Sequence, residues 1–201
     1  NKEATEFFNR YKDVSNFPIF GQNYYGYQYI TEQYPGIVEW DAKHIKIYSI
    51  DIETTSEGGF PNVDSPTEQM LVITLQDNNT KKITTWGVGE FTPGEDTKHL
   101  DIEYVYCKDE RELLVSFLGW WRDNCPDIIT GWNSQLFDIP YLLARTEKIL
   151  GEGEHKKFSP FGLVNKRPIR FQQRELTAYE ITGVAQLDYL DLYKKFTYVT
   201  R

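Results

Sequence analysis

The order of strand and helix patterns between residues 44 and 153 limits the possible folds more than any other feature of the sequence. Residues 44–53 (HIKIYSIDIE) have the β-branched and aromatic composition of a strand. Residues 70–88 predict two further strands, joined by a turn at Asp77–Thr80 whose Asp and Asn residues favour a hairpin. This part of the chain is therefore predicted to form neighbouring strands of one sheet.

Two helices are predicted at residues 109–124 and 138–153, with a short apolar strand at residues 127–132 between them. The first helix has an Asp-x-x-Glu start and apolar residues that recur along one helical face. The second has Pro140 in its first turn and Gly151 after its last. Strand, hairpin, helix, strand and helix in this order predict an α/β fold, a mixed sheet flanked by helices.

Composition excludes several classes of protein. Of the 201 residues, 40% are hydrophobic and 15% aromatic, which is ample for a packed core. No apolar run approaches the roughly 20 residues of a membrane span. The only two cysteines, Cys107 and Cys125, and the three scattered histidines have no zinc-ligand spacing, which favours a reducing cytoplasm.

Residues 1–40, rich in Asn, Gln and Tyr, predict loops and short strands. Because the chain has no initial Met, it is expected to be part of a longer protein.

The net charge of −8 by itself argues against a nucleic-acid partner, but charge is distributed unevenly along the chain. Residues 1–140 contain 11 Lys and Arg against 23 Asp and Glu, a balance of −12. Residues 141–201 contain 11 against 7, a balance of +4. This asymmetry is expected where an acidic site lies beside a basic rim for a polyanion, but an unevenly charged solvated surface would look the same.

Two acids, Asp51 and Glu53, stand at the end of the strand at residues 44–53. In an extended chain, positions i and i+2 point to the same face, so these two carboxylates lie side by side. Two like charges about 4 Å apart repel each other by ~4 kcal/mol at an effective dielectric constant of about 20. Either this face is solvent and the pair has no role, or a cation binds between them.

A second polar group, Asn133, Phe137 and Asp138, lies in the predicted strand-to-helix turn TGWNSQLFDIPYL. An Asp just before Ile-Pro is typical of a helix N-cap, and capping alone would explain Asp138. In α/β sheets, however, ligands bind at the carboxyl ends of strands, where Asp51 and Glu53 also lie. We therefore expect the three acids to lie at one edge of the sheet, where their oxygens would suit divalent cations.

These two groups of residues resemble motifs of a known protein family. IDIET, followed by GWNSQLFDIPYLLAR, resembles the first and second exonuclease motifs of family B DNA polymerases, and KFSPFGLV and LDYLDLYKKF resemble the replicative polymerases of tailed bacteriophages. The resemblance covers about residues 36–201 and implies a ribonuclease-H-like fold with a β-hairpin insertion. It implies a proofreading 3′–5′ exonuclease domain at residues 45–201, which would remove nucleotides from a primer 3′ end during DNA replication. Residues 1–44 would be the end of the preceding polymerase domain.

The resemblance also implies a catalytic set. Two Mg²⁺ or Mn²⁺ ions about 4 Å apart would clamp the scissile phosphate. Asp51 matches the ligand that bridges the two ions, and Glu53 matches the ligand that also orients the attacking water. Asp138 matches the acid that holds the second ion.

Four residues are predicted to contact DNA. Phe137 would stack or wedge against terminal bases, a contact that tolerates any base, or would be a core residue. Thr54 and Asn133 match positions that touch the end of the single strand, although Asn133 could equally turn the chain. Residues 165–183 predict two strands around a Gln-Gln turn, and in the related phage polymerases a hairpin here helps to separate primer from template. Arg174 would then touch a phosphate or a terminal base, or would be a solvated arginine.

One departure from the family concerns its third motif, Tyr-x-x-x-Asp. No aspartate of this sequence has a tyrosine four residues before it. Asp188 and Asp191 in LDYLDLYKKF have the wrong spacing and are predicted instead to cap and line the start of a helix. We therefore expect the chain to stop before this motif, and the 201 residues alone to have weak or no exonuclease activity.

Two other classes of function stay open. A non-catalytic module that binds single-stranded DNA is one, although such a chain would be expected to lose Asp51 or Glu53. Another ribonuclease-H-like nuclease or nucleotidyl transferase would share the carboxylates but not the LDYLDLYKKF stretch. The resemblance implies a single-stranded 3′ end, primer-template DNA and the remainder of a polymerase chain as partners. It implies the cytoplasm of an infected bacterial host as the location.

Overall fold

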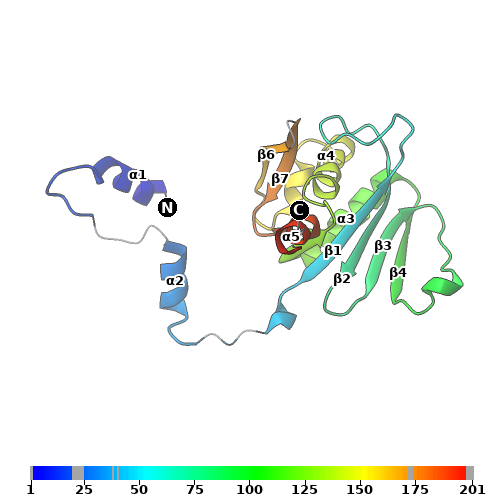
Figure 1. Ribbon diagram of the computed structural model, residues 1–201, viewed down its shortest axis with the longest axis horizontal. Coiled ribbons are helices and arrows are strands. Elements are labelled where there is room, and N and C mark those ends of the chain that lie inside the picture. Colours follow the sequence, from blue (N-terminus) through cyan, green and yellow to red (C-terminus); the bar gives the residue numbers. More distant parts are fainter. Residues whose placement is uncertain (1, 20–24, 38, 40, 172–173, 198–201) are drawn as a thin grey trace. The chain divides into compact units, whose positions relative to one another are not determined.

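The structure is a computed structural model that describes residues 2–19, 25–37, 39, 41–171 and 174–197. It divides into two compact units, Asn1–Asp41 and Ala42–Arg201, whose elements are labelled in Figure 1. In chain order the elements are α1 (Lys2–Tyr11), α2 (Tyr25–Gln33), η1 (Ala42–His44), β1 (Ile47–Thr54), β2 (Met70–Asp77), β3 (Ile83–Val88), η2 (Glu95–Thr97), β4 (Ile102–Cys107), α3 (Glu110–Asn124), β5 (Ile128–Gly131), α4 (Asp138–Leu150), η3 (Glu154–Phe158), β6 (Val164–Phe171), β7 (Arg174–Ile181), β8 (Ala185–Asp188) and α5 (Tyr189–Phe196). Within the described residues, no helix has the length and apolar character to cross a membrane.

The first unit contains two helices, α1 and α2, and the prediction of loops and short strands there was wrong. Side-chain pairs one helical turn apart account for the difference. In α1 the ring centroids of Phe7 and Tyr11 are 4.7 Å apart, and in α2 the Gln28 amide donates to the Glu32 carboxylate at 2.9 Å. The aromatic composition favoured strands, but contacts between i and i+4 neighbours stabilise a helix.

Six strands of the second unit form one mixed sheet in the order β4-β3-β2-β1-β5-β8. β2 is antiparallel to both of its neighbours, and the other neighbouring pairs are parallel. The predicted turn joins β2 and β3, and the Asp77 carboxylate accepts the N–H groups of Asn79 and Thr80 there. The fold class predicted from the sequence, a mixed sheet flanked by helices, is confirmed.

One edge of this sheet was not predicted. No strand was predicted between residues 90 and 108, but Ile102–Cys107 form β4 alongside β3. The Pro and Gly residues at positions 93 and 94 dominated the pattern. The β-branched and aromatic sequence IEYVYC was the signal for a strand.

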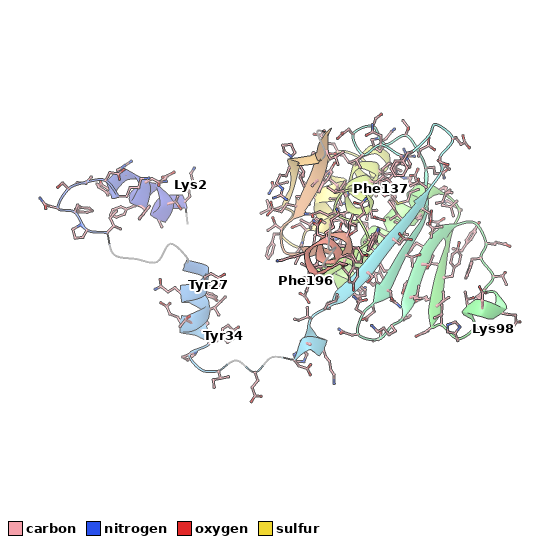
Figure 2. All side chains as sticks on the ribbon, viewed as in Figure 1. Lys2, Tyr27, Tyr34, Lys98, Phe137 and Phe196 are labelled. Atoms are coloured by element: carbon pink, nitrogen blue, oxygen red, sulfur yellow. The ribbon has the colours of Figure 1, made fainter. Side chains whose placement is uncertain are left out.

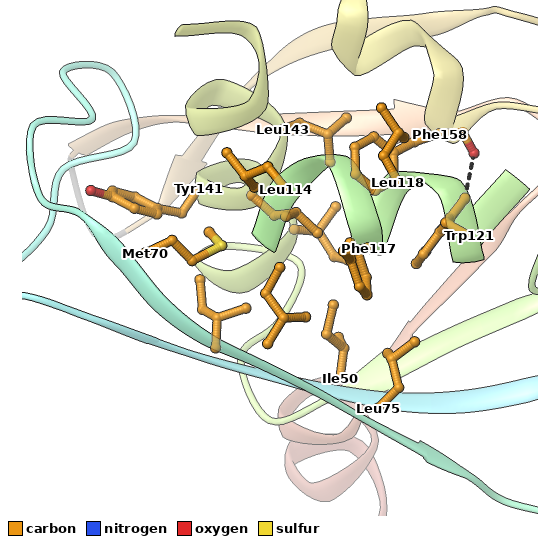
Figure 3. Packing of buried hydrophobic residues seen from close by; sticks show 14 of the residues in the cluster. Ile50, Met70, Leu75, Leu114, Phe117, Leu118, Trp121, Tyr141, Leu143 and Phe158 are labelled. Carbon is orange, nitrogen blue, oxygen red and sulfur yellow. Dashed lines mark hydrogen bonds between the residues drawn. The ribbon is translucent and has the colours of Figure 1, made fainter. Parts of the chain in front are cut away.

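The core lies where α3 and α4 pack on one face of the sheet (Figure 3). The predicted apolar stripe of α3 is buried, including Leu114, Phe117 and Trp121, and the Trp121 indole N–H donates to the Phe158 carbonyl at 2.8 Å. Each such side chain stabilises the fold by about 1.5–3 kcal/mol. Figure 3 also shows α5 on the opposite face of the sheet, where it contacts β5 and β8.

A separate two-stranded sheet, β6 and β7, forms the predicted hairpin, and β7 packs against α4. Both predicted strands are confirmed. The predicted turn at Gln172–Gln173 lies outside the described residues.

Candidate active site

The two acids of the first motif lie on one face of β1, as their spacing predicts. Ile50 and Ile52 point into the core, so the alternating residues Asp51 and Glu53 are exposed on the opposite face. Successive side chains of a strand point to opposite faces of the sheet, and here the second face is exposed at both acids. Both carboxylates are therefore available to a ligand.

Asp138 lies beside the same strand. The parallel ladder between β1 and β5 ends at Ser49 and Thr130, and farther along β1 the Oδ1 of Asp138 accepts the Ile52 N–H at 3.1 Å. The alternative that Asp138 is the N-cap of its helix is wrong, because the N-cap is Phe137. Asp138 is the first helical residue, and its carboxylate bonds to the sheet.

A close approach of two backbones fixes where β5 leaves β1. At Gly131, the last residue of β5, a Cβ atom would lie 2.7 Å from the Ile50 carbonyl oxygen, so a larger residue would push the strands apart. The chain then turns through Asn133, whose φ of 61° lies in the left-handed region. This turn returns the chain toward β1 at Asp138.

The electrostatics of the two motifs are coupled. Asp138 is only 5% exposed, and burial, together with the nearby charge of Asp51, raises the pKa of Asp138 to about 6. A divalent cation would offset both costs, and carboxylate oxygens are the ligands that Mg²⁺ and Mn²⁺ prefer, so the donor set fits such an ion. In the part of the chain that the structure describes, no group of three or more His, Cys, Asp or Glu side chains is gathered as a metal site. In the structure, Asp51 lies close enough to Asp138 to raise its pKa. That Glu53 also binds a metal ion stays a prediction.

A cleft of 650 Å³ is lined in part by the turn that leads to Asp138. Its walls come from the β1–β2 loop, the β5–α4 turn and strand β7; its lining residues are Phe60, Pro61, Asn62, Val63, Asp64, Asn133, Leu136, Phe137, Leu176 and Thr177. Two of the predicted DNA contacts, Asn133 and Phe137, thus lie in one cleft, and Phe137 directly precedes Asp138. The cleft is large enough to receive a nucleotide or a similar group.

Phe137 is half-buried. It therefore lies between the two alternatives that the sequence left open, a core residue and a ring that stacks on terminal bases. Its ring stacks on Tyr141, with centroids 5.7 Å apart, and meets the Phe60 ring at 5.1 Å (Figure 2 shows the position of Phe137). Phe60 is 84% exposed and was not predicted from the sequence. An exposed aromatic ring over a cleft is a surface on which a base can stack.

The loop that carries Phe60 is held by a buried carboxylate. Glu68 accepts the Thr55 hydroxyl at 2.5 Å and the N–H groups of Glu57 and Gly58, and these hydrogen bonds, the Thr55 one foremost, lower the pKa of Glu68. A Cβ atom on Gly58 would lie 2.9 Å from the Glu68 carboxylate. The loop is therefore ordered by its own acid rather than by regular secondary structure.

A buried ion pair fixes the far end of the same loop. The Arg145 guanidinium binds both oxygens of Glu110, at 2.5 and 2.7 Å, and donates to the Pro66 carbonyl at 2.8 Å. Glu110 also accepts the Met70 N–H at 2.9 Å. Arg145 and Glu110 come from α4 and α3, so the core helices hold the start of β2 and the loop before it.

The two other predicted DNA contacts are Thr54 and Arg174. Thr54 is half-buried at the end of β1, just after a register shift between Glu53 and Thr54. Arg174 is the first residue of β7, paired with Phe171, so it lies beside the hairpin turn as predicted, but its side chain is not among those described. The DNA contacts of both residues stay predictions.

The fold and the carboxylates of β1 and α4 place the chain in the ribonuclease-H-like α/β class. The model of the family described as "DNA polymerase family B, exonuclease domain" matches residues 27–201. The chain belongs to this family.

Three relatives are similar over much or all of the chain. The DNA-directed DNA polymerase of Enterobacteria phage T4 is 30% identical over 98% of the chain, and that of Escherichia phage RB69 is 27% identical over 100% of it. A DNA polymerase of Pyrococcus glycovorans is 29% identical over 73% of the chain. The chain spans only 24% of the length of the two phage polymerases and 16% of the archaeal one.

Proposed function

We propose that this chain is the proofreading part of a phage-type DNA polymerase and hydrolyses the 3′-terminal phosphodiester of a DNA strand. The observation that carries the proposal is the placement of the Asp138 carboxylate on the edge of β1 beside Asp51, in a chain of an exonuclease family. Two repelling carboxylates, one of them buried, are unfavourable for a purely structural role. They are suited to binding a cation at the scissile phosphate.

The acids would have different tasks. Divalent cations held by Asp51, Glu53 and Asp138 would lower the pKa of a bound water and neutralise charge on the leaving oxygen. Asp51, exposed on β1, would accept a cation from solvent, and Glu53, on the same face, would orient the attacking water. Asp138 is held by the Ile52 N–H, so its carboxylate is already oriented before substrate arrives.

The cleft would hold the end of the strand. Phe60 and Phe137 offer ring faces to the terminal bases without reading their identity, as an editing enzyme requires. Asn133, in the wall of the same cleft, and Thr54, at the end of β1, would contact the sugar and phosphate near the acids. The chain would thus receive any 3′ end and hydrolyse its last linkage.

The test is an oligonucleotide of single-stranded DNA labelled at its 5′ end, incubated with Mg²⁺ or Mn²⁺. With protein in excess over DNA, we expect a slowly formed ladder of products shortened one nucleotide at a time from the 3′ end. We expect no shortening of a strand whose 3′-terminal linkage is a non-hydrolysable analogue. Binding without shortening would favour a DNA-binding module instead. Internal cuts would favour another ribonuclease-H-like nuclease.

A further inference from the structure

Asp188, at the carboxyl end of β8, makes more hydrogen bonds than a helix cap requires. It is 7% exposed, and its Oδ1 accepts the N–H of Leu190 at 2.8 Å, which caps α5 as predicted. The same carboxylate also accepts the N–H of Asn133 at 2.9 Å and that of Gln135 at 3.0 Å. Two of its three bonds therefore go to the β5–α4 turn, more than 50 residues earlier in the chain.

These two N–H groups belong to a turn that leads directly to the catalytic acid. Asn133 is in the left-handed region, and its carbonyl accepts the N–H groups of Leu136 and Phe137. The Ser134 carbonyl accepts the N–H of Ile139, in the first turn of α4. A continuous set of hydrogen bonds thus connects the Asp188 carboxylate, through the turn, to the first residues of α4.

We propose, on the basis of the proposed function, that Asp188 is a positioning residue: it fixes the β5–α4 turn so that Asp138 faces Asp51 and Phe137 lines the cleft. β5 and β8 are parallel neighbours, paired at Gly131 and Asp188, so both strands end at the same edge of the sheet. Asp188 is held by its own strand and by α5. It therefore gives the turn a rigid support.

The same bonds make Asp188 a poor replacement for a metal ligand. Its Oδ1 accepts two N–H groups and its Oδ2 accepts a third, so these donors fill three of the roughly four acceptor positions of the carboxylate. Asp188 therefore acts on the site mainly through the backbone of the turn, and its charge adds a smaller effect, after burial and Asp51, to the raised pKa of Asp138. Removal of the Asp188 carboxylate should change how Asp138 is held without removing a ligand.

The variant Asp188→Ser separates capping from positioning. A serine hydroxyl can still accept the Leu190 N–H and cap α5, but it is too short to hold the two N–H groups of the turn as well. Asp188→Asn keeps a carbonyl oxygen at the Oδ1 position and should recover part of the function. The matched control is Asp109→Ser in α3, because Asp109 caps its helix through the Glu112 N–H at 2.8 Å, away from the turn.

Three measurements on the full 201-residue chain test the proposal. In metal-free buffer, amide hydrogen exchange at Asn133 and Gln135 should accelerate in Asp188→Ser, while exchange at Leu190 stays slow. With Mn²⁺ and protein in excess over a 5′-labelled single strand, the rate constant at saturation should fall about 10²-fold, and the half-saturating protein concentration should stay the same. Affinity for Mn²⁺ alone should fall, and Asp109→Ser should leave all three quantities unchanged.

The outcomes distinguish this proposal from the proposed function. A wild-type rate constant and wild-type Mn²⁺ affinity in Asp188→Ser would reduce Asp188 to a helix cap and overturn the proposal. If the wild-type chain binds Mn²⁺ but does not shorten the strand, the proposed function fails, and the Mn²⁺ affinity of the variant still decides whether Asp188 positions the acids. A wild-type chain that neither binds Mn²⁺ nor shortens DNA would overturn both.

Discussion

Asp138 combines burial with a neighbouring like charge, and each disfavours its ionised form. Its pKa is raised from 3.8 to about 6, so the folded chain holds this proton more tightly than the unfolded chain does. The Asp138 carboxyl therefore does not lower the free energy of unfolding below about pH 4. As the pH rises through 6, it increasingly destabilises the metal-free fold. At pH 7.5 the full cost is on the order of 2–3 kcal/mol.

Replacing Asp138 by Asn should stabilise the metal-free chain at pH 7.5 by up to that amount and have little effect at pH 4. The Asn carbonyl oxygen can still accept the Ile52 N–H, so the hydrogen bond to the sheet survives. Urea unfolding in EDTA at the two pH values measures the difference. Asp123→Asn, which removes an exposed acid of α3, is the control. A variant that is less stable than the wild type at both pH values would contradict the account.

Phe60 should contribute to binding DNA and little to stability. Because it is 84% exposed, Phe60→Ala should change the free energy of unfolding by less than about 0.5 kcal/mol. Loss of one base–ring stack should weaken single-strand binding by about 1–3 kcal/mol, roughly 5- to 150-fold. Fluorescence anisotropy with a labelled oligonucleotide in Ca²⁺ measures this affinity. Phe91→Ala, in another loop, is the control, and equal affinities for all three chains would remove Phe60 from the site.

At the scale of elements, the Glu110–Arg145 pair joins α3, α4 and the loop before β2. Arg145→Met leaves the Glu110 carboxylate buried without its partner and should cost about 3–5 kcal/mol. The double variant with Glu110→Gln removes that charge and should recover much of the loss. Urea unfolding of the two variants tests this, and a double variant no more stable than the single one would show that the ion pair does not account for the effect.

The elements that the sequence predicted are those with local signals. The period-2 pattern of β1 gave the shared face of Asp51 and Glu53, the helical period gave α3, and Pro140 and Gly151 gave the ends of α4. The site residues that were missed depend on long-range contacts. The place of Phe60 depends on Glu68, which orders an irregular loop, and the second role of Asp188 depends on a turn more than 50 residues away in sequence. No local pattern encodes either arrangement.

At the scale of the molecule, the uneven charge predicts how DNA binding depends on salt. The positive balance of residues 141–201 should hold phosphates, so affinity for a single strand should fall linearly on a double logarithmic plot against salt, by about 0.7 for each phosphate neutralised. Reversing Lys166, which is exposed on the hairpin, to Glu should reduce this slope, whereas Lys98→Glu should not. A slope near zero for the wild type would mean that the basic segment does not contact the strand.

The rate of hydrolysis depends on groups that the three acids do not supply. Because no Tyr-x-x-x-Asp occurs in the 201 residues, a chain of these residues alone lacks the aspartate and the tyrosine of the family's third motif. Such groups are each worth about 10²–10⁴-fold in rate. We therefore expect turnover to be slow, and detectable only with protein in excess over DNA.

Single-turnover hydrolysis of a 5′-labelled strand in Mn²⁺ tests whether Asp51 and Asp138 together form the hydrolytic site. Wild type, Asp51→Ala, Asp138→Ala and the control Asp123→Ala are compared at saturating protein. We expect slow stepwise loss of 3′ nucleotides by the wild type and the control, and a rate at least about 10²-fold lower in each site variant, with DNA binding retained. Wild-type rates in both site variants would contradict this expectation.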